Sequence, residues 1–233
     1  FTTLLTAVEE TRHIFPLMVD AAEKVAALLL AGGRLFIGSG RPDFVSEAIV
    51  RSGGLMLIHE CSTDTVGPED GDAVLWGWSD MDHEAERARL GRVAGRGAFT
   101  VGMGPCSTIT SVGEWTATLD IFLENTASPP TDVLNAFANS PYPIISLQNL
   151  VLLWTFTGEL VAALTRGGHM PTMYQSVLVP GARQRNEQRV LHRFEAEHGV
   201  PPIDPGTLAG TYVDRLGDCL RNLASHEIES IEQ

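Results

Sequence analysis

Positive charge is scarce in this sequence. Its 233 residues include 29 Asp and Glu against 16 Lys and Arg, which gives a formal net charge of −13. Fifteen of the basic residues are arginine, and Lys24 is the single lysine. Proteins that bind nucleic acid or an anionic membrane surface present a basic face, so we expect neither partner. The sequence also lacks the GxxxxGKS or GxxxxGKT motif of a P-loop, and it offers one lysine for Schiff-base chemistry.

Cysteine and long apolar runs are scarce as well. Cys61, Cys106 and Cys219 are odd in number and far apart, so neither a disulfide framework nor a zinc site is predicted. Apolar stretches such as 150–156 are much shorter than the roughly 20 residues of a membrane span. The sequence shows no signal-peptide pattern. These observations predict a cytoplasmic protein in a reducing compartment, with no metal or other cofactor.

Apolar runs of strand length alternate along the chain with helical patterns. Strands are expected at 34–38, 55–58, 73–78, 98–103 and 119–123, with a short last strand at 173–179. A first helix is expected before Gly32, and Pro16 marks a kink or a fresh start in it. Further helices are expected at 42–51, 82–94 and 146–165, and in the tail from Gln184, where they are broken at 199–206. The alternation predicts a parallel sheet covered by helices on both faces. With 44% hydrophobic residues, the chain can bury the core of one domain.

Ligands of such sheets bind beyond the carboxyl ends of the strands, where the strand order reverses. For the order 2-1-3-4-5, the loops 38–43 and 79–84 border that crevice. Gly38-Ser39-Gly40 follows the first strand and opens a helix. Glycines permit close backbone approach, and a helix start offers free N–H groups. The motif therefore predicts ligand contact by residues 38–41, including Arg41, or else a tight strand-to-helix turn.

Several short segments, taken in order, resemble a known family. They are Gly38-Ser39-Gly40 with Glu47 and the run Arg51-Ser-Gly-Gly54-Leu; Gly71-Asp72-Ala-Val-Leu leading to Ser79; Asp120-Ile-Phe-Leu-Glu124-Asn125 with Pro129, Pro130 and Asp132; a helix with Glu159; and Pro171-Thr-Met-Tyr-Gln-Ser176 followed by Pro180-Gly181 and Asn186. The set covers about residues 5–195. It resembles the SIS (sugar isomerase) domain, in particular the small uncharacterised bacterial SIS proteins related to phosphoheptose isomerase.

The resemblance implies an α/β fold with three α/β/α layers and a five-stranded parallel sheet in the flavodoxin-like order. It implies a single domain over 1–233, with a core at about 5–195, and a helical extension is expected at 196–233. It also implies a sugar or sugar-phosphate ligand. Homodimers or homotetramers with sites near the subunit interfaces are expected for the same reason.

The sequence departs from the family where the family holds phosphate. SIS domains usually use a Ser-x-Ser-Gly-x-Ser/Thr loop after the third strand, but here that place reads Ser79-Asp80-Met81-Asp82-His83-Glu84. Residues 60–86 carry nine Asp or Glu and no Lys or Arg. Each carboxylate within about 4–6 Å of a phosphate opposes its binding by roughly 1 kcal/mol or more. We interpret Ser79 and Asp80 as ligand-binding residues. The alternative is that the acidic residues of this loop supply negative charge at the N-terminus of a helix, where it complements the helix dipole.

A small arginine cluster could compensate for these acids. Arg185, Arg189 and Arg193 are spaced four apart, which would place them on one face of a helix. Arg185 is therefore a candidate for contact with an anionic ligand. That ligand could be bound by the same subunit or lie across a subunit interface. The alternative is a solvated or intersubunit face that pairs with acidic residues.

An aldose–ketose isomerase needs a base and a second proton-transfer group. Glu47 is the candidate base, with an exposed or salt-bridged helix glutamate as the alternative. His169 and His59 are candidates for the second group, or structural histidines. Glu124 and Asn125 end the fifth strand, where they could bind sugar hydroxyls or cap the strand. Glu159, in an apolar helix, needs a partner if it is buried.

The leading hypothesis is a sugar- or sugar-phosphate-binding SIS protein that acts as an isomerase. The alternative is a non-catalytic sensor or regulatory module with a degenerate phosphate loop. A related lyase or etherase would need the same acid and base, so residue types do not separate it from an isomerase.

Overall fold

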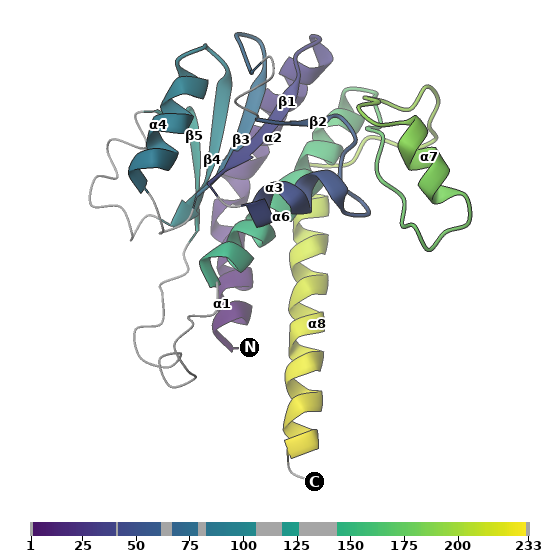
Figure 1. Cartoon of the computed structure of the whole chain (residues 1–233). Coiled ribbons are helices and arrows are strands. Elements are labelled where there is room, and N and C mark those ends of the chain that lie inside the picture. Colours follow the sequence, from purple (N-terminus) through teal and green to yellow (C-terminus); the bar gives the residue numbers. More distant parts are fainter. Residues whose placement is uncertain are drawn as a thin grey trace.

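The computed structural model describes residues 2–40, 42–61, 67–78, 83–105, 118–125 and 144–231. Its centre is a parallel sheet of five strands in the order β2-β1-β3-β4-β5. The strands are β1 (Leu35–Ser39), β2 (Ile58–Glu60), β3 (Ala73–Gly77), β4 (Phe99–Pro105) and β5 (Ile121–Asn125). The expected α/β class and strand order are therefore confirmed (Figure 1).

Helices cover both faces of the sheet. Helices α2 (Phe15–Leu30), α3 (Pro42–Val50) and α6 (Ile144–Arg166) lie on one side, and α4 (His83–Ala94) lies on the other (Figure 1). The larger core cluster joins α2, α3 and α6 to side chains such as Leu35 and Ile37 of β1. Because side chains alternate along a strand, Phe36 points the other way, into a smaller cluster with Leu90 of α4.

The N-terminal helical region is divided in two. Helix α1 (Thr2–Glu10) leads through a 3₁₀ turn (Thr11–Ile14) into α2. Pro16 stands in the first turn of α2, where its missing N–H costs no intrahelical hydrogen bond. Pro16 therefore marks a fresh start and not a kink.

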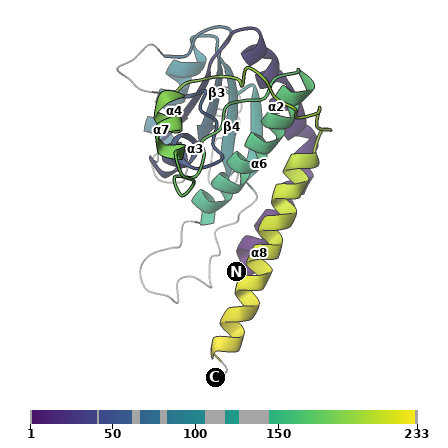
Figure 2. The same cartoon turned by 90° about the vertical axis from the view of Figure 1, so that its right-hand side faces the viewer.

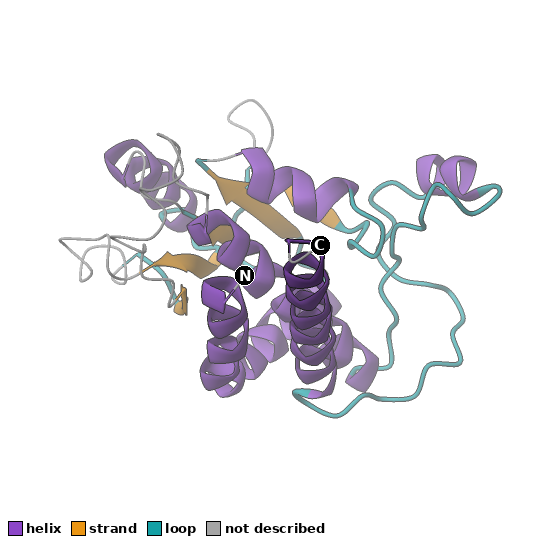
Figure 3. Cartoon of the chain, turned by 90° about the horizontal axis from the view of Figure 1, so that it is seen from below, coloured by secondary structure: helices purple, strands orange, loops and turns teal. Residues whose placement is uncertain are grey.

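A long helix, α8 (Thr207–Ile231), packs against α6 and α1 and extends past the other helices (Figure 2). Ion pairs link it to the N-terminal region, between Arg12 and Asp214 at 2.5 Å and between Arg221 and Glu9 at 3.2 Å. Seen from below, the N-terminal helices and α8 lie side by side (Figure 3). The two ends of the described chain therefore meet in one layer.

Two predicted elements differ from the structure. The second strand is at Ile58–Glu60 and not at 55–58, because Met56 instead donates its backbone N–H to the Thr172 carbonyl at 2.9 Å. Correspondingly, 173–179 is not a strand of the sheet, and Met173 forms one isolated antiparallel bridge with Leu55. A strand of the sheet and a local pair of loop segments carry the same apolar pattern, so sequence alone does not separate them.

The arginine-rich segment is also not one helix. Helix α7 (Ala182–Gln188) ends before Arg189 and Arg193, and Leu191 has a positive φ of 61°. That backbone conformation is incompatible with a continuing right-handed helix. The prediction that Arg185, Arg189 and Arg193 share a helical face is therefore wrong. Helix α7 and its loops stand out from the side of the molecule (Figures 1 and 3).

Helix α6 begins two residues before and ends one residue after the predicted helix at 146–165. Over residues 146–166 it is long and apolar enough to cross a membrane by length and composition, with a mean hydropathy of 1.4. However, 78% of that window is buried inside the protein. Such burial is typical of the core helix of a sheet layer.

Candidate functional site

The carboxyl ends of the strands gather several of the predicted site residues at one edge of the sheet. Ser39 ends β1 and Asn125 ends β5, so Gly38, Ser39, Gly40, Glu124 and Asn125 all lie at this edge. Arg41, Ser79 and Asp80 lie outside the described residues. We refer to this end of the sheet as the carboxyl edge.

Gly38 is explained by packing within the sheet. A Cβ at Gly38 would lie 2.4 Å from the ring of Trp76, far inside van der Waals contact. Gly104 likewise leaves room for Trp78, since a Cβ at Gly104 would lie 2.3 Å from the Trp78 indole. Both indoles are about 99% buried. The glycine at position 38 therefore makes room for a large aromatic side chain of the neighbouring strand.

Gly40 contacts a carboxylate that comes from α4. Its backbone N–H donates to Oε1 of Glu86 at 2.5 Å, and Glu86 is only 4% exposed. One turn further along α4, Arg89 donates to the Ser39 carbonyl at 3.3 Å and lies over the Trp76 ring at 5.6 Å. Neither Glu86 nor Arg89 was predicted to contact this turn, because they lie 46 and 50 residues after the residues that they contact.

Asn125 has a structural partner at the same edge. Its side-chain N–H donates to Oδ1 of Asn149 at 2.8 Å, and Asn149 donates to the Trp78 carbonyl at 2.7 Å. Asn125 and Asn149 are 2% and 4% exposed. The two amides thus tie β5 and the chain after β3 to helix α6. Glu124, by contrast, is exposed.

Glu47 lies where α3 meets α6. Arg51 donates from Nε to both carboxylate oxygens at 2.8 Å, and the Trp154 indole N–H donates to Oε1 at 3.3 Å. Its side chain remains 21% exposed. Glu47 is a residue predicted from the sequence, whereas Trp154, 107 residues further along the chain, was not predicted.

Helix α8 adds a tyrosine near this carboxylate. Burial raises the pKa of Tyr212 to about 12, and the negative charge of Glu47 adds to the shift. The phenol therefore stays protonated at neutral pH and can donate a hydrogen bond. Glu47, Trp154 and Tyr212 come from three helices, α3, α6 and α8, and we call them the Glu47 cluster.

The two candidate histidines lie elsewhere. His59 pairs with Phe36 in the register of β2 and β1, and the two rings are 5.2 Å apart. Burial lowers the pKa of His59, and the charge of Arg34 adds to this. Among the described residues, no hydrogen bond or ion pair joins His59 or His169 to Glu47.

His169 lies towards the opposite, amino edge of the sheet. Its Nδ1 is 2.9 Å from the Gly167 carbonyl, and its ring is 5.0 Å from that of Phe194. The neighbouring Arg193 bonds to the carbonyls of Leu29 and Gly32, at the end of α2 and shortly before β1 begins. The structure therefore separates His169 from the carboxyl edge.

Arg185 pairs within its own segment. Arg185 and Arg189 form ion pairs with Glu195 at 3.1 and 2.5 Å. Burial opposes ionisation of Glu195, but the Arg189 hydrogen bond and the two positive charges outweigh it and lower the pKa. Arg185 also donates to the Met173 carbonyl at 2.9 Å. These contacts fix α7 to the loops on either side of it.

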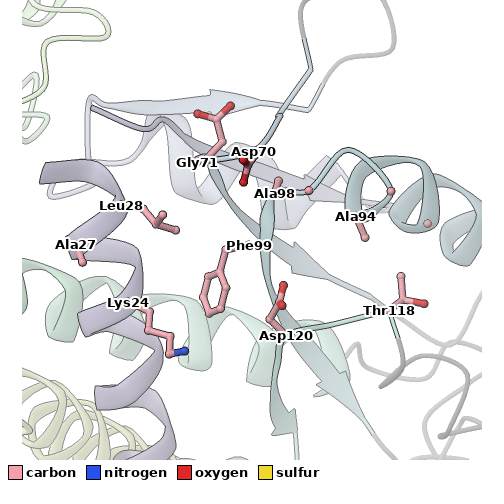
Figure 4. Close-up of a pocket in the computed structure, with 14 residues that line it drawn as sticks. Lys24, Ala27, Leu28, Asp70, Gly71, Ala94, Ala98, Phe99, Thr118 and Asp120 are labelled. Carbon is pink, nitrogen blue, oxygen red and sulfur yellow. The ribbon is translucent and has the colours of Figure 1, made fainter. Parts of the chain in front are cut away.

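The described residues form a hollow of about 880 Å³ at the amino edge, between α2 and α4 (Figure 4). The exposed amine of Lys24 lies 5.7 Å from the Phe99 ring, and Asp120 lies close by (Figure 4). Asp120 accepts hydrogen bonds from the backbone and side chain of Thr100 at 2.7 and 2.9 Å. The described residues contain no group of three or more His, Cys, Asp or Glu able to hold a metal ion.

Comparison with known proteins gives a likeness to solved structures and none to known families or curated sequences. No family model matches the chain, and no curated protein matches it. Among solved structures, the chain is similar to a "putative phosphosugar isomerase" from Silicibacter pomeroyi DSS-3, with 12% sequence identity and a TM-score of 0.44. The match covers 90% of this chain and 55% of that one. The chain therefore spans little more than half the length of that protein.

Proposed function

We propose that this protein binds a sugar or sugar phosphate and isomerises it between aldose and ketose, with Glu47 as the base. The observation that carries the proposal is the Glu47 cluster, in which a carboxylate with a 21% exposed side chain is oriented by the Trp154 indole N–H at 3.3 Å. The ordered SIS-like segments of the sequence support the sugar class of ligand.

The contacts around Glu47 suit proton abstraction. A general base must be ionised, oriented and reachable. Arg51 donates a hydrogen bond to the carboxylate, and the Trp154 indole N–H orients one of its oxygens. Trp154 is also half-buried, and an indole presents a broad apolar face against which a sugar ring can pack.

The reaction requires two proton movements. Glu47 takes the proton from the carbon next to the substrate carbonyl while the carbonyl oxygen receives a proton, which gives an enediol. Glu47 then returns its proton to the former carbonyl carbon. A second group moves a proton between the two oxygens. We assign that role to the neutral phenol of Tyr212, because it lies within electrostatic reach of Glu47, whereas His59 and His169 make their contacts elsewhere.

The experiment has two stages. A thermal-shift panel of sugars and sugar phosphates identifies ligands, and turnover assays on those ligands test conversion. Glu47→Gln keeps the size of the side chain but removes the base, so turnover is expected to fall at least 100-fold while binding persists. Glu187→Gln, an exposed residue of α7, makes the same charge change as a control. A Glu47→Gln protein with normal turnover would contradict the assignment.

The second candidate function is a sugar sensor without catalysis. The hydrogen bond between Glu86 and the Gly40 N–H favours it, because that backbone donor is already used by a side chain of the protein. Ligands that bind without being converted by the unmodified protein would support the sensor. A homodimer or homotetramer and a cytoplasmic location stay predictions from the resemblance and the composition.

A further inference from the structure

We propose that Glu86 determines ligand specificity at the carboxyl edge. Because its carboxylate accepts the hydrogen bond of the Gly40 N–H, the turn after β1 accepts an uncharged part of the ligand and excludes a phosphate group. This inference rests on the proposed sugar-binding function, because it states which sugars the turn after β1 admits. It concerns other residues than the Glu47 cluster.

The contact between Glu86 and the turn is close and buried. The hydrogen bond to the Gly40 N–H is 2.5 Å long, and Glu86 is 96% shielded from solvent. A Cβ at position 40 would lie 2.1 Å from the same Oε1. The Glu86 carboxylate therefore fills the space beside Gly40, and a larger residue at position 40 would require that carboxylate to move.

A phosphate at this turn would meet two obstacles. Its oxygens would have to replace Oε1 of Glu86 at the Gly40 N–H, and its charge would lie beside a carboxylate. Like charges at about 4 Å repel strongly where burial lowers the effective dielectric constant. A sugar hydroxyl carries neither cost, since it can donate to a carboxylate.

Arg89 does not offset this effect while Glu86 is in place. It is held by the Ser39 carbonyl at 3.3 Å and by the face of Trp76. Removal of Glu86 would leave the Gly40 N–H without its acceptor and Arg89 as the nearby charge on α4. The structure therefore predicts that loss of Glu86 creates phosphate affinity at this turn.

The test uses inorganic phosphate as the probe and the amide signal of Gly40 as a local reporter in ¹⁵N NMR. In the unmodified protein, the Gly40 signal is expected not to respond to phosphate. In Glu86→Ala, it is expected to shift, with an affinity at least ten-fold tighter than in Glu84→Ala. Glu84 is exposed on the same helix, so its removal controls for the general loss of negative charge.

A second variant covers the case in which Glu86→Ala does not fold. Glu86→Gln keeps the volume and an oxygen that can accept from Gly40, so its affinity for phosphate is expected to rise about three-fold over Glu84→Gln. The proposal is overturned if neither Glu86 variant binds phosphate more tightly than its Glu84 counterpart, or if phosphate shifts the Gly40 signal in the unmodified protein. None of these measurements depends on turnover, so the isomerase proposal stands or falls separately.

Discussion

Asp72 is a nearly buried carboxylate that joins the segments preceding two neighbouring strands. It accepts the Arg34 backbone N–H at 2.8 Å and the Arg34 guanidinium at 2.6 Å, just before β1, and it precedes β3 itself. It also accepts the Glu69 backbone N–H at 3.1 Å. Burial opposes its ionisation, but the hydrogen bonds from Arg34 outweigh it, so the pKa of Asp72 is lowered.

This lowered pKa gives a signed prediction for stability in acid. The folded state favours the charged form, so the stabilisation is complete above the ordinary pKa of about 3.8 and is lost as the pH falls through the folded value. Asp72→Asn is expected to lower the free energy of unfolding by about 3 kcal/mol at pH 7, with less difference at low pH. Urea unfolding between about pH 2 and pH 7 measures both effects.

Glu69→Gln is the matched control for Asp72. Glu69 pairs with the same arginine at 3.1 Å, but its side chain is 68% exposed. Exposed ion pairs contribute about 1 kcal/mol or less. If Asp72→Asn and Glu69→Gln lost the same unfolding free energy, burial of Asp72 would not strengthen its contact with Arg34.

Some individual site residues could be predicted from sequence and others could not. Gly38 and Gly40 were located at a strand-to-helix turn, since the turn is a local pattern. That Trp76 and Glu86 fill the space beside them could not be predicted, because those contacts join residues 38 and 46 positions apart. Tyr212 is still further from Glu47 in sequence, and only the packing of α8 brings it near.

At the scale of elements, Glu159 fixes the start of α8 to the core. It is fully buried, and its two oxygens accept from Arg166 at 3.2 Å and from the Gly206 backbone N–H at 2.8 Å. Gly206 immediately precedes α8. The carboxylate therefore meets the backbone donors that a helix start leaves without intrahelical partners, which identifies the partner that a buried Glu159 was expected to need.

We expect Glu159→Gln to lower the free energy of unfolding by about 3 kcal/mol, because Arg166 then loses a buried partner. Amide hydrogen exchange in residues 206–210 is expected to become faster as the helix start loosens. Glu23→Gln provides the comparison, since Glu23 binds the same arginine at 2.6 Å but is 47% exposed. If Glu23→Gln lost more unfolding free energy than Glu159→Gln, the exposed contact of Arg166 with Glu23 would be the more important of the two.

Where apolar residues recur with a clear helical or strand period, the ends of the element were predicted to within about two residues. Helix 42–51 appears as Pro42–Val50 and strand 73–78 as Ala73–Gly77. The 173–179 prediction was wrong because apolar residues there pair locally with the loop after α3. The phosphate-loop region of the prediction, at 79–82, lies outside the described residues.

At the scale of the whole molecule, α8 completes a hydrophobic core. Val213 and Leu220 of α8 are buried with Val8 of α1 and Val151 of α6. The division into a core at about 5–195 and an extension at 196–233 stays a prediction. Because the extension supplies buried side chains to the core, we expect the two parts not to be separable.

A shortened chain tests this expectation. A protein that ends at residue 204 lacks α8 and leaves apolar surface of α1 and α6 in water, where each side chain costs about 1.5–3 kcal/mol. Several such losses approach the whole stability of a domain, so cooperative thermal unfolding by circular dichroism should disappear. A chain that ends at residue 225 keeps Val213 and Leu220 and should unfold at the full-length temperature. Unchanged unfolding of the shorter chain would contradict this view.

The single lysine has a practical consequence. The fold places the exposed Lys24 beside Phe99 at the amino-edge hollow, whereas Gly40 and Glu86 lie at the carboxyl edge. A reagent that acylates side-chain amines therefore has one target in this sequence, at the opposite end of the strands from Gly40 and Glu86. A fluorophore or tether attached to Lys24 would therefore be placed away from the turn after β1.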